Sequence, residues 1–496
     1  MGKHGVFGEV PEGEELAHPG AHEQREKDAT VRRTISSVLG SPRFWLLPLL
    51  LVLIVMSLMA SVYLGAIADP EKNLHNFPIA LVDEDGGGTL DDGNTSTDVN
   101  YGKQVADGII ANAAKSGIAV HRADRITALN ELNAGKVYGV VVLGANFTSS
   151  VLALGKSTVL QARPEPVTIN VYINRGSGTF ASAITTTFAE RVSDQVNQQM
   201  GRQLTDTVRA QLAKADIAFS GAAQLAVWQP VKVEVIEATA LPDGSGNGLS
   251  AFYFTLLLIL AGFTGAMMVS IVVDGILGQT PIEYGPFYQL RVRLAISRRG
   301  TLAVKWTIMA LVAVVQSMLF IGVCTAVGTS LPNAFTLWLF SVLVIFAVGV
   351  TASSMMAVFG NVGLILNLIF FVILGLPSSG GTMPLEASPR LFTWIASVEP
   401  MHLVYLGVRA ILYFDADWGA GLGRSVIQTI IGLVLGALLG WLGTTLYDRK
   451  GWHRYPGGMR LPARLAAILD KTGTPTITEP SPHHSPVTQD SGASTS

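Results

Sequence analysis

The run FWLLPLLLVLIVMSLMASVYLGAI, from Phe44 to Ile67, carries no charged side chain. A bilayer core about 30 Å thick needs roughly 20 such residues, because an α-helix rises about 1.5 Å per residue. Five later runs have the same character, so the sequence predicts six transmembrane helices. The predicted spans are Phe44 to Ile67, Leu249 to Val273, Trp306 to Gly328, Phe335 to Phe359, Gly363 to Leu376 and Ser425 to Leu446.

The composition agrees with a membrane protein. Of the 496 residues, 49% are hydrophobic and 14% are charged, whereas ordinary soluble domains have roughly a quarter charged residues. A net charge of -2 argues against a nucleic-acid-binding protein, which needs a clear excess of Lys and Arg. The single cysteine, Cys324, lies in the third predicted span, so the part outside the membrane folds without a disulfide.

Basic residues set the expected orientation, because Lys and Arg close to the membrane stay on the cytoplasmic side. They gather before the first span, between the second and third, and after the sixth, while residues 329 to 333 have none. We therefore expect a cell-membrane protein with both termini cytoplasmic. Ala66-Ile67-Ala68 resembles a signal-peptide cleavage site, but the run is long and follows a polar tail, which favours a retained anchor.

This pattern predicts a polytopic α-helical membrane protein, one helix followed by five, with an inserted extracytoplasmic α/β domain that carries long helices. The expected parts are a cytoplasmic tail (1–43), transmembrane helix 1 (44–67), the α/β domain (68–248), a five-helix membrane domain (249–446) with a re-entrant segment (377–420), and a second cytoplasmic tail (447–496). Residues 1–30 and 471–496 are too poor in apolar side chains to order.

The α/β domain is predicted from short β-type runs separated by turns and helical patterns. Strands are expected at Pro78 to Val82, Ile118 to Val120, Val137 to Leu143, Val167 to Ile173 and Val231 to Ile236, with a loop up to Asn100. A later apolar row repeats every four residues from Phe180 to Leu212. Because a helical turn has 3.6 residues, we expect a bend near Gly201 or a change of packing partner along this helix.

Candidate catalytic and ligand motifs fail on spacing. Gly155-Lys156-Ser157-Thr158 lacks the first glycine of a P-loop, and Gly244, Gly246 and Gly248 lack the strand and helix of a dinucleotide site. The acidic residues around Asp83-Glu84-Asp85 do not match a calcium loop and indicate a solvated turn. We predict no catalytic, cofactor-binding or metal site, and no enzyme activity.

The predicted spans contain no Asp, Glu, Lys, Arg or His, which argues against coupling to a proton gradient. Gln316, Asn361, Asn367 and Gln428 remain as polar groups; they either bond between helices or line a pathway. Between the second and third spans we expect a helical, amphipathic stretch that either docks a partner or lies on anionic lipid. Its candidate contact residues are Glu283, Tyr284, Tyr288, Arg291 and Arg293.

After the fifth span, apolar pieces alternate with helix breakers, which predicts a re-entrant segment packed on the helices. Ser379-Gly380-Gly381-Thr382-Met383-Pro384, followed by Pro400 and Arg409, resembles an element of the type-2 ABC exporter membrane-domain superfamily. The similarity is greatest to its YhgE/Pip and nitrosoguanidine-resistance-like branch. Ala80 to Asp85, and Gly135 to Val141 with Asn146-Phe147-Thr148, resemble segments of that branch's external domain.

The resemblance implies a permease, usually a homodimer in the lipid bilayer, that exports a hydrophobic or amphipathic compound with energy from a separate ATPase subunit. In that case Glu283 to Arg293 contacts the ATPase. The gate would comprise Ser379, Gly380, Gly381, Thr382, Pro384 and Arg409. A membrane scaffold that binds an envelope component through the α/β domain remains the alternative, because a fold does not fix a function.

Overall fold

The structure is a computed structural model, and it describes residues 42–67, 69–91, 96–159, 166–214, 224, 227–289, 291, 294 and 296–452. Six helical stretches in these ranges are long and apolar enough to cross a membrane, as predicted. Most of both predicted tails lies outside the described residues. The spans are α2 (Pro42–Ile67), α8 (Leu249–Ile276), α9 (Arg298–Ala326), α10 (Ala334–Phe359), the fifth stretch Asn361–Ser378, and α15 (Gly423–Arg449).

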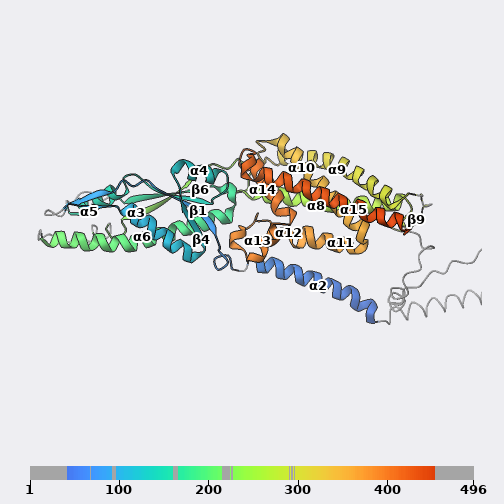
Figure 1. Ribbon diagram of the computed structural model, residues 1–496, viewed down its shortest axis with the longest axis horizontal. Helices are drawn as coiled ribbons and strands as arrows, with labels where there is room; N and C mark the ends of the chain where they lie inside the picture. The colour runs from blue at the N-terminus through green and yellow to red at the C-terminus, as the bar shows by residue number, and fades with distance from the viewer. Residues whose placement is uncertain are drawn as a thin grey trace, which may run out of the picture. The chain divides into compact units, whose positions relative to one another are not determined.

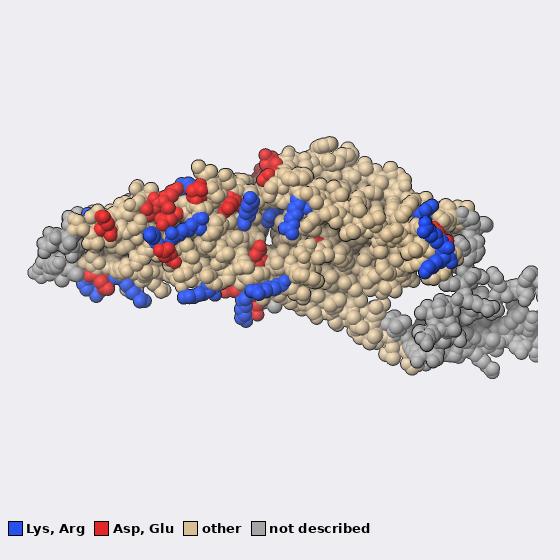
Figure 2. Space-filling view, in the orientation of Figure 1, with Lys and Arg blue, Asp and Glu red and all other residues tan. Residues whose placement is uncertain are grey.

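Charged side chains avoid the membrane helices. Figure 2 shows Lys, Arg, Asp and Glu over the α/β domain and at the far end of the helices, with a belt almost free of charge between them. The belt faces outward with large apolar side chains such as Leu319 and Leu442, which are 57% and 58% exposed. A lipid environment satisfies such a surface, and water does not.

The fifth stretch is a broken helix. It consists of α11 (Asn361–Leu368), the π-helical turn η3 (Ile369–Ile373) and α12 (Gly375–Ser378). Asn367 is fully buried and its Nδ2 donates to the Ala352 carbonyl of α10 at 3.0 Å. Inside a membrane such a bond between helices satisfies a polar group that lipid cannot, so this contact fixes α11 against α10.

Helix α10 packs against α8, α9 and α15 (Figure 1). Small residues permit the close approach: a Cβ on Gly436 of α15 would overlap Thr351, and one on Gly440 would overlap Ser354. Membrane helices associate through such small-residue contacts because no hydrophobic force drives apolar helices together in lipid. These contacts place α15 along the length of α10.

The facing ends of α8 and α9 extend beyond the predicted spans and contain charge. Asp274 of α8 and Lys305 of α9 form an ion pair of 2.8 Å, and their side chains are 15% and 4% exposed. Asp448 at the end of α15 accepts bonds from the first two amides of α9, at Arg298 and Arg299 (3.0 and 3.1 Å). The absence of charge predicted for the spans therefore does not extend to the full helices.

Between α2 and α8 in the chain lies the α/β domain, built on one five-stranded sheet of order β4-β1-β5-β6-β7. The β1–β4, β1–β5 and β6–β7 pairs are parallel, and the β5–β6 pair is antiparallel. All five predicted strands are present within one or two residues at their ends. Their bounds are β1 Phe77–Asp83, β4 Ile118–Arg122, β5 Gly139–Leu143, β6 Val167–Ile173 and β7 Val231–Glu237.

Helices cover both faces of the sheet (Figure 1). One core joins Ile79 and Leu81 of β1 to α3 (Tyr101–Ala113), α5 (Phe147–Val159) and α6 (Thr179–Lys214). The second joins Ala80 and Val82 to α4 (Arg125–Asn133). Side chains of β1 alternate between the two cores, as successive strand residues must.

The long helix α6 runs unbroken through Gly201, so the expected change of packing partner, and not a bend, accounts for the four-residue row. Thr185 packs on Gly139 of β5, and Asn197 bonds both backbone groups of Val231 at the start of β7. At Gly201 a Cβ would overlap the carbonyl of Trp228. Glycine is required where that backbone comes so close.

The acidic stretch after β1 is more ordered than predicted. The expected loop contains the hairpin of β2 (Gly88–Asp91) and β3 (Ser96–Val99). The predicted solvated turn is also only partly correct, because the Asp85 carboxylate accepts bonds from the Gly102 amide (3.1 Å), the Thr148 amide (2.9 Å) and the Thr148 hydroxyl. Asp85 thus joins the starts of α3 and α5.

Candidate functional site

The re-entrant segment contains two short helices bent by 76° at Ser397 to Glu399. They are α13 (Arg390–Ala396) and α14 (Pro400–Tyr413), flanked by the 3₁₀ turn η4 (Leu385–Ala387) and the π turn η5 (Trp418–Leu422). Pro400 occupies the first position of α14, where its missing amide hydrogen costs nothing. The segment packs on α8, α10 and α15.

Glu399 determines the start of α14 and was missed by the sequence analysis. Its Oε2 accepts from the Met401 and His402 amides at 2.8 and 3.3 Å, and its side chain is almost fully buried. Among the described residues, Oε1 has no hydrogen-bond partner. The motif Glu-Pro before an apolar helix is a capping signal that could have identified it.

The predicted gate residues Ser379 to Pro384 form a tight turn beside this cap. The Ser379 hydroxyl accepts from the Gly381 amide (3.2 Å), and its carbonyl lies 2.9 Å from His402 Nδ1. Gly380 has a φ of 72°, and a Cβ on Gly381 would overlap the Phe252 ring of α8. Glycine is therefore favoured at 380 by the backbone conformation and at 381 by the close approach of the Phe252 ring. Thr382 is exposed and Pro384 is buried.

Arg409 does not join this turn. It lies two turns further along α14 from His402, about 10 Å at 1.5 Å per residue. Its guanidinium carbon lies 5.7 Å from the centre of the Tyr405 ring and 5.2 Å from that of Phe414, and the side chain is buried. A Cβ on Gly135, after α4, would come within 3.2 Å of it. Arg409 thus packs at the junction with the α/β domain.

Further contacts hold the α/β domain to the re-entrant segment. The Tyr138 hydroxyl donates to Glu386 at 3.0 Å, and the His75 amide donates to the Glu386 carbonyl at 2.8 Å. The Tyr413 hydroxyl donates to the Ser245 carbonyl at 3.3 Å and accepts from the Ala251 amide at 3.3 Å. The re-entrant segment is therefore hydrogen-bonded to the chain before the α/β domain, at His75, and to the chain after it, at Ser245 and Ala251.

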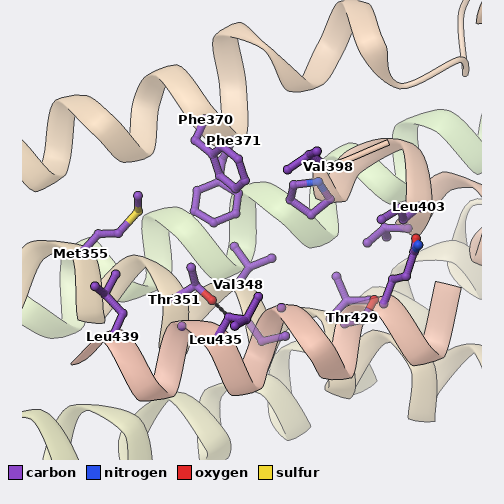
Figure 3. Close-up of a pocket in the computed structure, with 17 residues that line it drawn as sticks. Val348, Thr351, Met355, Phe370, Phe371, Val398, Leu403, Thr429, Leu435 and Leu439 are labelled. Atoms are coloured by element: carbon purple, nitrogen blue, oxygen red, sulfur yellow. Dashed lines mark hydrogen bonds between the residues drawn. The ribbon is translucent and has the colours of Figure 1, made fainter. Parts of the chain in front are cut away.

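A cavity of about 300 Å³ lies among α10, η3, the start of α14 and α15 (Figure 3). We call it the membrane cavity. Phe370 and Phe371 face Thr351 and Leu435 across it. Val398 and Leu435 at its rim are 66% and 62% exposed, so the cavity opens sideways from the helices. A compound dissolved in the bilayer can reach such an opening directly.

The membrane cavity is largely apolar, and its polar side chains are Thr351, Gln428 and Thr429. The Thr351 hydroxyl donates within its own helix to Ala347 at 2.9 Å. Gln428 Oε1 is buried and has no hydrogen-bond partner among the described residues. A Cβ on Gly432 would meet nothing within 4 Å. Apolar walls with few polar groups are typical of small-molecule sites.

A protein-family profile described as "Protein of unknown function (DUF3533)" matches residues 48–443. The chain belongs to the DUF3533 family. The match runs from α2 into α15 and so includes the membrane cavity, the α/β domain and the re-entrant segment. No curated protein and no solved structure matches the chain.

The DUF3533 match also includes the predicted partner-contact segment, which is not the expected helix. It contains the hairpin of β8 (Ile282–Tyr284) and β9 (Phe287–Gln289), in which Glu283 pairs with Tyr288. Gly285 has a φ of 57°, and Gly-Pro at 285–286 is a turn signal that favoured a hairpin over a helix. Glu283, Tyr288 and Arg291 are exposed, the side chain of Tyr284 is not described, and Arg293 lies outside the described residues.

Within the described part of the chain, no three His, Cys, Asp or Glu side chains gather as metal ligands would. Glu399 and His402 meet at the α14 cap, but Glu399 accepts from two amides of α14 and His402 Nδ1 lies against the Ser379 carbonyl of the gate turn. The arrangement that best suits a ligand in this DUF3533 protein is therefore the membrane cavity.

Proposed function

We propose that this protein is the permease subunit of an exporter that moves a hydrophobic or amphipathic compound out of the cell. The observation that carries the proposal is the sideways-opening membrane cavity. Its walls suit a hydrocarbon chain or ring system, and the side chains of Thr351, Gln428 and Thr429 supply the few polar groups of the lining. Entry from the bilayer explains how a poorly soluble substrate reaches it.

The proposed orientation places both termini in the cytoplasm and the α/β domain outside the cell membrane. Arg298, Arg299 and Lys450 lie at the ends of α9 and α15, where the positive-inside rule predicts the cytoplasm. The re-entrant segment then lies on the outer side, with Val398 and Pro400 on the wall of the membrane cavity. Movement of α13 and the Ser379–Pro384 turn would open the cavity outward.

Energy comes, in this proposal, from a separate ATPase that binds the β8–β9 hairpin. Phe287 and Tyr288 are 74% and 66% exposed at its tip, and Ile282 packs on Gly275 of α8. A displacement of the hairpin by the ATPase would move α8, and α8 contacts both α10 and α14. The proposed assembly is a homodimer of such subunits in the bilayer.

The test compares cells that lack the protein with cells that regain it. The measured quantity is the rate of loss of a preloaded fluorescent amphiphile, for a panel that varies in chain length and head charge. Faster loss of at least one compound in complemented cells supports the proposal, and stoichiometric recovery of an ATPase with the tagged protein supports the energy source. Equal rates across the panel would contradict export.

The alternative is a membrane scaffold that binds an envelope component through the α/β domain. The exposed surface of α6 is the observation that favours it, since polar residues such as Glu190, Asp194 and Gln198 are free to contact a partner. Charge reversal at Arg291 and Arg293 separates the two hypotheses. It should abolish export by a permease and leave envelope binding by a scaffold unchanged.

A further inference from the structure

A second cavity, of about 340 Å³, lies in the α/β domain beside the connector that follows α2. We call it the connector cavity. Its apolar wall consists of Leu74 from the connector, Ile118 at the start of β4, and Phe180, Ile184 and Phe188 from α6. Phe188 is 7% exposed and forms the base, whereas Phe180 is 49% exposed and lies at the mouth.

The mouth also carries one charge of each sign. Arg191 Nη2 and Glu71 Oε2 form an ion pair of 3.0 Å, and their side chains are 58% and 77% exposed. Exposed pairs of this kind contribute little to stability, so the pair is free to exchange partners. A zwitterionic group would match it, with its anion beside Arg191 and its cation beside Glu71.

The connector cavity lies close to the membrane surface. Pro70, which lines it, follows the end of α2 at Ile67 by three residues, a distance of at most about 10 Å. A molecule that leaves the bilayer on this side therefore needs to move only a short way to enter. Large apolar side chains at this position would otherwise contact water.

Helix α13 contacts the connector and is followed in the chain by residues that line the membrane cavity. At one side, Thr393 Oγ1 lies 3.4 Å from Nε2 of His75, the neighbour of Leu74. At the other, the chain after α13 continues into Val398 and Pro400, which line the membrane cavity. Leu391 and Trp394 of α13 are 62% and 71% exposed. These two side chains give α13 an exposed apolar surface.

We propose that the connector cavity receives the apolar chain of a single-chain amphiphile with a zwitterionic head, after it leaves the membrane cavity across α13. This inference rests on the proposed export function and assigns its second binding site and substrate class. The connector cavity, at about 340 Å³, lies near the lower end of the range of small-ligand sites, which is about 300–1,000 Å³. A volume this small suits one apolar chain and not the two chains of a bilayer lipid. The chain lies against Phe180 and Phe188, and the head lies at Glu71 and Arg191.

The test uses the full chain in lipid nanodiscs and a lysophosphatidylcholine with a diazirine in its acyl chain. After illumination and tryptic digestion, labelled peptides are identified by mass spectrometry. Cleavage after Arg175 and Arg191 releases residues 176–191 with the α6 wall, and cleavage after Arg424 and Arg449 releases residues 425–449 with the α15 wall of the membrane cavity. Label in both peptides is expected.

A variant that fills the connector cavity, compared with a matched control, tests whether the label in residues 176–191 comes from a molecule bound in that cavity. Ala183 is exposed and lines the connector cavity, so Ala183→Trp should abolish label in residues 176–191 and leave label in residues 425–449. Ala111→Trp, at an exposed position of α3 that lines neither cavity, should leave both. A monoacylglycerol probe, which has an uncharged head, should label residues 176–191 less.

Each other result is decisive. Label in residues 425–449 without label in residues 176–191, or label in residues 176–191 that persists in Ala183→Trp, would overturn the connector cavity and leave the export proposal standing. Label in residues 176–191 without label in residues 425–449 would count against the membrane cavity and keep the second site. Equal labelling by the uncharged probe would overturn the assignment of a zwitterionic head.

Discussion

The Tyr138 hydroxyl of the α/β domain and the Glu386 carboxylate of the re-entrant segment lie 3.0 Å apart, although 248 positions separate them in the chain. The Tyr138 ring stacks on Phe77 of β1 with centroids 4.6 Å apart. This pair joins the start of β5 to the re-entrant segment. Tyr138→Phe keeps the stack and loses the hydrogen bond, so it tests the junction with little change in packing.

We predict that Tyr138→Phe lowers the free energy of unfolding by about 1.5–3 kcal/mol, as expected for a hydrogen bond to a charged group. Thermal unfolding in detergent measures the change. Tyr172→Phe, on the adjacent strand β6, is the matched control and should have a smaller effect. Equal effects in the two variants would show that the Tyr138 hydroxyl contributes nothing to the junction.

The same residue gives a prediction on pH. Burial, with the negative charge of Glu386, raises the pKa of Tyr138 well above its ordinary value of 10.0. Above pH 10.0 the unfolded chain therefore loses this proton before the folded chain does, and the stability falls as the pH rises. From about pH 9.5 to about pH 11, the free energy of unfolding of the wild-type protein should fall more steeply than that of Tyr138→Phe. Parallel curves would contradict the prediction.

The ion pair of Asp274 and Lys305 should hold α8 and α9 together. Lys305→Met leaves a nearly buried carboxylate beside an apolar group, which costs about 3–5 kcal/mol. Lys72→Met, which breaks the exposed pair with Asp69, should cost less than about 1 kcal/mol. The two melting temperatures in the same detergent provide the comparison. Similar small shifts would mean that water reaches the α8–α9 pair.

Asp85 should be the structural member of the acidic turn. Asp85→Ala removes the acceptor for the Gly102 and Thr148 amides, and a loss of about 1–3 kcal/mol is expected for donors left without a partner. Glu84→Ala, which breaks only the exposed pair with Arg125, is the control and should cost less than about 1 kcal/mol. Hydrogen exchange at the starts of α3 and α5 should increase only in Asp85→Ala.

Glu399 should act as a helix cap whose charge is not essential. Gln retains an acceptor for the Met401 and His402 amides, so Glu399→Gln should stay close to wild type, while Glu399→Ala should lose about 0.5–2 kcal/mol. Thermal unfolding of the two variants gives the comparison. An equal and large loss in both would show that the carboxylate itself is needed.

The sequence was sufficient for the six spans and the five main strands because apolar length and β-type runs are local signals. Val167 to Ile173, for example, was predicted with the bounds that β6 has. It failed at residues 282–289, where amphipathic character suggested a helix although Gly285-Pro286 indicated a turn. The predicted second span also ended before Asp274, although α8 continues past it. The sequence around Asp274 gives no sign that its charge is paired with Lys305, 31 positions away.

The candidate site was less predictable, because it depends on contacts between distant segments. Gln428 was identified as a polar group with two possible roles, and only its position on the cavity wall separates it from Asn367, which bonds to α10. The need for glycine at Gly381 follows from Phe252 of α8, over a hundred positions earlier. No local pattern contains that information.

We propose that the exported compound occupies the membrane cavity, and one pair of variants tests this directly. Gly432→Phe fills the cavity without a clash at the backbone, whereas Gly322→Phe adds the same ring on α9, away from the cavity, where a Cβ also meets nothing within 4 Å. The measurement is the export rate in complemented cells at equal protein level. We expect the export rate of Gly432→Phe to fall to that of cells without the protein, while Gly322→Phe matches wild type. Wild-type export by Gly432→Phe would contradict it.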